Sequence, residues 1–69
     1  MVSGECRDVV LTFLSEHTGR QPYIIARMTK RYSRITVLHA LRALCADGLA
    51  RFEGPDTQRR YFKVGRARN

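Results

Sequence analysis

Cysteine, histidine and the carboxylates, the side chains that most often carry chemistry, are few in this sequence and widely spaced. Cys6 and Cys45 lie 39 positions apart. The two histidines, His17 and His39, fall at no metal-ligand spacing from them. We therefore expect two reduced thiols in the core, with no metal and no other cofactor. The six acids form no recognisable acid–base pair with the histidines, and no glycine-rich phosphate loop occurs, so the sequence predicts a protein that is not an enzyme.

The sequence is instead rich in lysine and arginine, whose positive side chains bind phosphates and other anions. Thirteen Lys and Arg against six Asp and Glu give a net charge of +7. Eleven of the 13 cations lie in two stretches that contain no acid, residues 17–46 and 57–69. If these stretches fold side by side they make one positive face, which indicates a protein that binds a polyanion. The alternative is a generally basic, solvated surface.

Three amphipathic segments must position these cations. The first predicts a helix over residues 3–16, capped by Ser3 and ended by a left-handed glycine at Gly19. The second is a short helix that opens at Pro22, a residue favoured in the first helical turn. The third begins at the N-cap Ser33 and stops at residues 47–48, where Gly48 supplies a left-handed turn. The stripes expected to be buried are Cys6, Val9, Val10, Phe13 and Leu14, then Ile24, Ile25 and Met28, then Val37, Leu38, Leu41, Leu44 and Cys45.

After the third helix the apolar residues no longer recur at helical spacing but at every second position. Residues 50–53 and 59–64 predict two strands, joined by the turn formers of residues 54–58. We expect Phe52, Phe62 and Val64 to face inward. We expect Arg51, Tyr61 and Lys63 to face outward. The whole order predicts an α+β domain, mainly α, of three helices followed by a two-stranded β-hairpin over residues 1–65, with a basic flexible tail at 66–69.

These elements resemble the winged helix-turn-helix transcriptional regulators of bacteria, archaea or viruses. The residues that carry the resemblance are Ile25-Ala26, Ser33-Arg34-Ile35-Thr36-Val37, Leu41, Leu44, Gly48-Leu49 and Tyr61-Phe62 followed by Val64. It covers residues 6–64 and departs at Ala50, where a valine is usual. It departs also in the short link between the first two helices, which leaves little room for the small first strand of many members. The resemblance implies that the helix from Ser33 is the recognition helix and that residues 54–60 form the wing tip.

Side-chain chemistry gives roles to residues in both regions. The hydroxyls of Ser33 and Thr36, with the helix N-terminus, can hold a phosphate. Ile35 can contact a thymine methyl, with packing on the second helix as the alternative. His39 and Arg42 can reach base edges or the flanking backbone, or can simply be solvated. The candidate DNA-binding residues are Lys30, Arg31, Ser33, Arg34, Ile35, Thr36, His39, Arg42, Arg59 and Arg60.

We therefore expect a sequence-specific double-stranded DNA-binding protein, a small transcriptional regulator with its third helix in the major groove and its wing on the backbone or in the minor groove. Partners are double-stranded DNA and, because the core is thin, a second copy in a homodimer. We expect no membrane contact and a cytoplasmic, nucleoid-associated location, since the first residues do not form a signal peptide. The alternatives are a winged-helix protein-interaction adaptor, or a binder of RNA or left-handed DNA.

Overall fold

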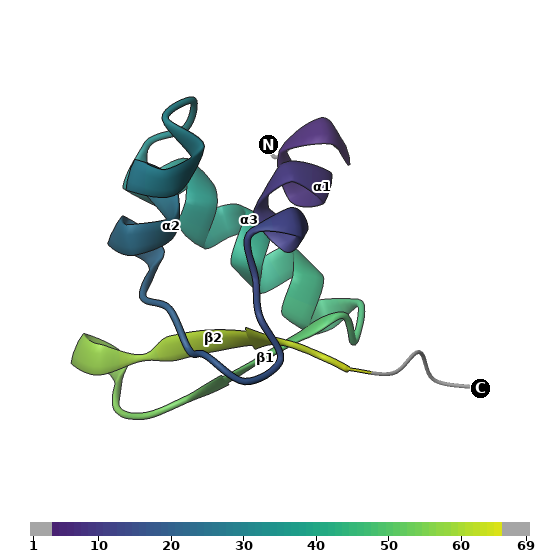
Figure 1. Cartoon of the computed structure of the whole chain (residues 1–69), viewed down its shortest axis with the longest axis vertical. Helices are drawn as coiled ribbons and strands as arrows, with labels where there is room; N and C mark the ends of the chain where they lie inside the picture. The colour runs from purple at the N-terminus through teal and green to yellow at the C-terminus, as the bar shows by residue number, and fades with distance from the viewer. Residues whose placement is uncertain (1–3, 66–69) are drawn as a thin grey trace.

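The computed structural model describes residues 4–65, apart from the side chain of Asp56. The elements follow in the order α1 (Gly4–Thr12), α2 (Pro22–Thr29), α3 (Arg34–Ala46), β1 (Ala50–Glu53), the 3-10 turn η1 (Asp56–Gln58) and β2 (Arg60–Lys63) (Figure 1). The predicted α+β class, mainly helical and with one antiparallel hairpin, is confirmed. The expected cap Ser3 and the expected tail, residues 66–69, lie outside the described residues.

The first helix ends earlier than predicted because local hydrogen bonds turn the chain away. The backbone N–H groups of Phe13 and Leu14 donate to carbonyls three residues earlier, which tightens the last turn. The hydroxyl of Ser15 then accepts the backbone N–H groups of His17 and Thr18, each at 3.2 Å. A serine that caps backbone groups in this way competes with continued helix.

Gly19 has a different role from the predicted left-handed turn. Among the described glycines only Gly48 and Gly54 have a positive φ, so the prediction is wrong for Gly19 and is confirmed for Gly48, at 78°. A Cβ on Gly19 would lie 2.6 Å from the ring of Phe62 and 2.8 Å from the Cβ of Arg60. Glycine is therefore needed here because the backbone runs directly against β2.

The link between α1 and α2 forms a minimal third strand beside the hairpin. Arg20 and Tyr61 exchange two backbone hydrogen bonds, of 3.2 and 2.8 Å. The backbone N–H of Lys63 donates to the carbonyl of Ser15 at 2.9 Å. The link is too short for a longer strand, but this single bridge ties the N-terminal part of the chain to β2.

The boundaries of α2 and α3 follow from local signals. Pro22 is the first residue of α2, as predicted, and Lys30 ends the helix in a left-handed conformation with φ at 59°. The hydroxyl of Ser33 caps α3 by accepting the backbone N–H of Thr36 at 3.2 Å. Both helices of the expected helix-turn-helix are therefore in place.

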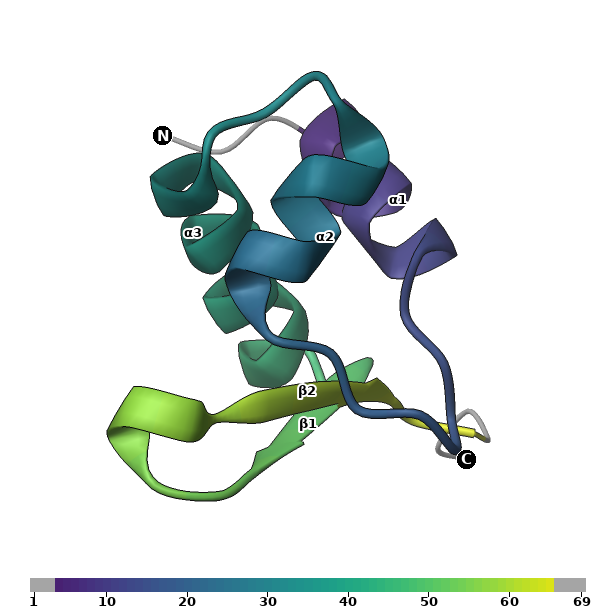
Figure 2. The ribbon, with the colours of Figure 1, turned by 60° about the vertical axis from the view of Figure 1, so that its left-hand side comes forward.

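One core joins the three helices and the hairpin. The helices stand above the hairpin, whose tip extends beyond them on the side away from α1 (Figure 1 and Figure 2). Met28, predicted to be buried, is instead 37% exposed. The buried apolar residues are Cys6, Val10, Leu14, Ile25, Val37, Ala40, Leu41, Leu44, Ala50 and Tyr61.

The inward and outward residues of the hairpin differ from the prediction. Tyr61 is only 2% exposed, whereas Phe52 is 46% exposed. The two are cross-strand partners, and partners in an antiparallel pair point to the same side of the sheet. The prediction placed them on opposite sides, which is an error of one residue in β2. Phe62, on the other side, is half-buried and packs over Gly19.

Candidate nucleic-acid interface

The outer face of α3 carries two neighbouring rows of side chains. Ile35 and His39, four residues apart, form one row, and both are exposed. Arg34, Leu38 and Arg42 form the other row by the same spacing. Ile35 is 64% exposed, so its side chain is largely free to contact a partner.

A cleft of about 800 Å³ lies between the second row of α3, the start of α2 and the hairpin. Arg34 and Arg42 enter it from α3, and Arg59 enters from the hairpin. Among the residues whose side chains the structure describes, none that lines the cleft is acidic. The remaining lining residues are Gln21, Pro22, Tyr23, Leu38, Thr57 and Tyr61.

Arg59 is the most enclosed of the three cleft arginines, being half-buried. Its guanidinium carbon lies 4.0 Å from the ring centroid of Phe52, which is a cation–π contact. It also lies near the half-buried thiol of Cys45. Burial raises the pKa of that thiol above its ordinary value, and the positive charge of Arg59 opposes this rise.

Arg60, the second arginine predicted at the wing, is exposed but does not line the cleft. It stands opposite Glu53 in the register of the hairpin. Its charge therefore lies on the side of β2 away from Tyr61, because successive strand residues point to opposite faces.

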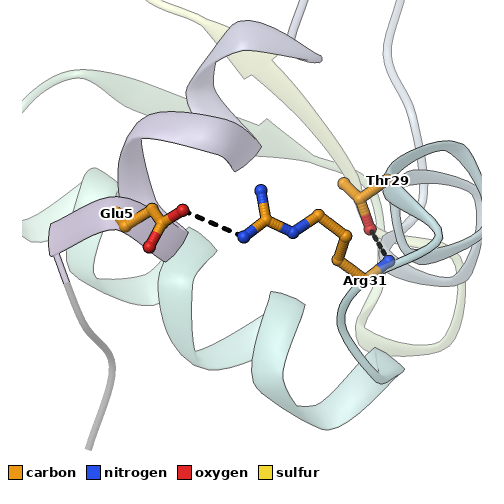
Figure 3. Close-up of polar contacts among 3 residues, drawn as sticks. All are labelled: Glu5, Thr29 and Arg31. Carbon is orange, nitrogen blue, oxygen red and sulfur yellow. Dashed lines mark hydrogen bonds and ion pairs between the residues drawn. The ribbon is translucent and has the colours of Figure 1, made fainter.

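Arg31 is turned toward α1 rather than into the cleft. Its Nη2 donates to Oε2 of Glu5 at 2.9 Å, and its backbone N–H donates to the hydroxyl of Thr29 at 3.4 Å (Figure 3). Its guanidinium carbon also lies 5.4 Å from the ring centroid of Tyr32. The hydrogen bond with Glu5 is the largest cause that raises the pKa of Arg31 above its ordinary value.

The other predicted contacts near the turn are also outside the cleft. The hydroxyls of Ser33 and Thr36 lie 3.1 Å apart and are engaged with each other at the start of α3. Lys30 is exposed at the end of α2. The structure thus brings three of the ten predicted residues together in one cleft, Arg34, Arg42 and Arg59, and leaves the other seven on the surrounding surface.

Several cleft residues were not among the predicted contacts. Leu38 lies four residues after Arg34 and four before Arg42, so helical spacing could have identified it. Thr57 lies within residues 54–60, the expected wing tip, but no signal singles it out there. Tyr61, expected to face outward, reaches the cleft because the register of the hairpin turns it inward.

The side chains with metal or redox chemistry do not form a site in the described part of the chain. Cys6 is buried and Cys45 is half-buried, as expected for core cysteines. Burial is also the largest cause that raises the pKa of Cys6. No group of three His, Cys, Asp or Glu among residues 4–65 could hold a metal ion. None of the helices described is long and apolar enough to cross a bilayer.

Comparisons with protein-family models, with curated proteins and with solved structures gave no match for this chain, so its charges and geometry carry the functional argument.

Proposed function

We propose that this protein is a small winged helix-turn-helix regulator of transcription that binds double-stranded DNA in a sequence-specific manner. In this proposal α3 is the recognition helix in the major groove, and the hairpin is the wing that contacts the backbone or the minor groove. The order of elements supports it, since α2 and α3 are joined by a short turn and the hairpin follows directly.

The observation that carries the proposal is the arginine-lined cleft beside the exposed face of α3. Arginine matches phosphate with two parallel hydrogen bonds. Arg34 and Arg42 are eight residues apart, which corresponds to about 12 Å along a helix axis. Arg34 and Arg42 are therefore separated along the helix, as successive phosphates are along a DNA strand, and do not surround a single point. The adjacent row, Ile35 and His39, is left to contact base edges.

An exposed helix face favours B-form DNA over RNA. The major groove of B-DNA admits a helix, whereas that of A-form RNA is too deep and narrow for side chains to read. A protein-interaction adaptor would use three arginines in this cleft only for an acidic partner, whereas every phosphate of a DNA strand supplies the negative charge that they match. Left-handed DNA remains a competing ligand for the experiment.

The test is a titration of labelled duplex with the purified protein at several salt concentrations. We expect affinity to fall steeply with salt, and Arg42→Ala and Arg59→Ala to reduce the salt slope by about one each. Arg27→Ala is the matched control, because Arg27 is exposed on α2 and lies outside the cleft. Binding that is indifferent to salt, or an equal loss in the control, would refute the proposal.

Competition and selection extend the same test. RNA and left-handed duplex are added as competitors, and either one displacing the labelled B-form duplex at equal concentration would favour that alternative. Selection from a random DNA pool then gives the preferred site. A palindromic site would indicate that a homodimer binds, because operator symmetry mirrors protein symmetry.

A further inference from the structure

Phe52 is a large apolar side chain that the core does not enclose. The residue is 46% exposed. One face of the ring lies 4.0 Å from the guanidinium carbon of Arg59. Tyr61 packs against the same ring, with the two centroids 5.8 Å apart and the planes tilted by 53°. Phe52 thus connects a core tyrosine to an arginine of the cleft.

We propose that Phe52 is a positioning residue that holds the guanidinium of Arg59 ready for a phosphate of the DNA backbone. This inference rests on the proposed function. An arginine side chain loses much rotamer freedom when it is fixed, and a guanidinium over an aromatic face is already fixed before DNA arrives. Phe52 does not line the cleft itself, so its effect on DNA passes through Arg59.

Tyr61 explains why the Phe52 ring can hold an arginine although it is exposed. Tyr61 is 2% exposed, and its backbone is paired with Arg20 on one side and with Phe52 on the other. The Phe52 ring therefore rests on a side chain that cannot move without disturbing the core. The core thus restrains Tyr61, Tyr61 supports the Phe52 ring, and the ring supports the guanidinium of Arg59 at the cleft.

The same hairpin contains a matched control. Arg51 lies with its guanidinium carbon 4.3 Å from the ring centroid of Phe62, and it is also paired with Glu53. Neither Arg51 nor Phe62 lines the cleft. Both stacks place a guanidinium over an aromatic ring. They differ in their position relative to the cleft and in the ion pair of Arg51 with Glu53.

The first measurement is duplex affinity by fluorescence anisotropy. Phe52→Leu keeps an apolar side chain but removes the aromatic face, and we expect it to weaken binding about two- to fivefold. Phe52→Tyr keeps the face and should bind like the wild type. In an Arg59→Ala background, Phe52→Leu should cause no further loss, because its effect requires the guanidinium. Arg51→Ala should weaken binding less than Arg59→Ala does.

The second measurement does not depend on DNA. The Arg59 side-chain N–H resonance should be shifted by the ring current of Phe52 in the free protein, and Phe52→Leu should abolish that shift while Phe52→Tyr retains it. Two results would overturn the role of Phe52 while the proposed function stands. In the first, Phe52→Leu binds duplex as tightly as the wild type. In the second, Phe52→Leu causes the same loss of affinity in the Arg59→Ala background as in the wild type. If the wild type binds no duplex, the proposed function fails and the role of Phe52 in binding fails with it.

Discussion

Replacing Ile35 with alanine separates a base-reading role from a structural one. The side chain is 64% exposed, so only about a third of it is buried. Removing a fully buried isoleucine to alanine costs about 2–5 kcal/mol, and a third of that is about 1 kcal/mol. Alanine is the better helix former by a few tenths of a kcal/mol, which offsets part of the loss. We therefore expect a thermal midpoint within roughly 8 °C of the wild type for a domain of this size.

The effect of Ile35→Ala on DNA should appear in sequence preference. A lost apolar contact with a thymine methyl removes discrimination at one base pair, where a mismatch typically costs about 1–3 kcal/mol. At the lower end this is about fivefold at that position. Because isoleucine carries no charge, the salt slope and the non-specific affinity should stay unchanged.

Selection of bound sequences from a random pool, with wild type and variant in parallel, measures this effect. Met28→Ala is the control, since Met28 is also an exposed apolar residue but lies on α2. We expect the preferred site to change at one or two adjacent base pairs for Ile35→Ala and at none for the control. An unchanged site would refute the base-reading role, and a large fall in the thermal midpoint would refute the argument from exposure.

Three further predictions concern the packing of the linker, the pairing of Arg31 and the buried thiols. Gly19→Ala should lower stability by about 1–3 kcal/mol, because the new Cβ would meet Phe62 at 2.6 Å. Gly4→Ala is its control in thermal melts, since a Cβ there meets nothing within 4 Å. Arg31→Ala should weaken duplex binding less than Arg42→Ala at the same salt concentration, because the Arg31 guanidinium already pairs with Glu5, and an equal loss would contradict that interpretation. Burial raises the pKa of Cys6 and Cys45, so their contribution to stability is fully present below the pKa of an unfolded thiol and is lost as pH rises toward the higher folded value. Denaturant titrations should therefore show the free energy of unfolding falling with pH in the alkaline range, and less steeply in Cys45→Ala; an equal slope would argue against the burial of this thiol.

The parts of the fold that local signals specify were predictable. Pro22, Ser33 and Gly48 act within one turn of their own position, so the start of α2 and both ends of α3 match the prediction. The period of two in the hairpin was also readable. The side of the sheet that each residue of β2 faces was not predictable. Tyr61 and Phe62 are adjacent and both apolar, so alternation cannot show which of them faces the core.

The candidate site was predictable only in composition. The charge distribution identified Arg34, Arg42 and Arg59 as cations of one face, but only the fold brings them to one cleft. The pairing of Arg31, which lies in the turn between α2 and α3, depends on Glu5, which is 26 residues away on α1. Sequence spacing contains no information about such a contact, since it depends on how α1 packs against α2 and α3.

The single bridge between Arg20 and Tyr61 has a consequence for how the molecule opens. A two-stranded hairpin is marginally stable by itself in water. Here the bridge, together with the bond from Lys63 to Ser15, joins the hairpin to the chain that precedes α2. The amides of Tyr61 and Lys63 should therefore exchange with deuterium as slowly as those in the middle of α3, and the hairpin should unfold with the helices as one cooperative unit rather than fray from its tip.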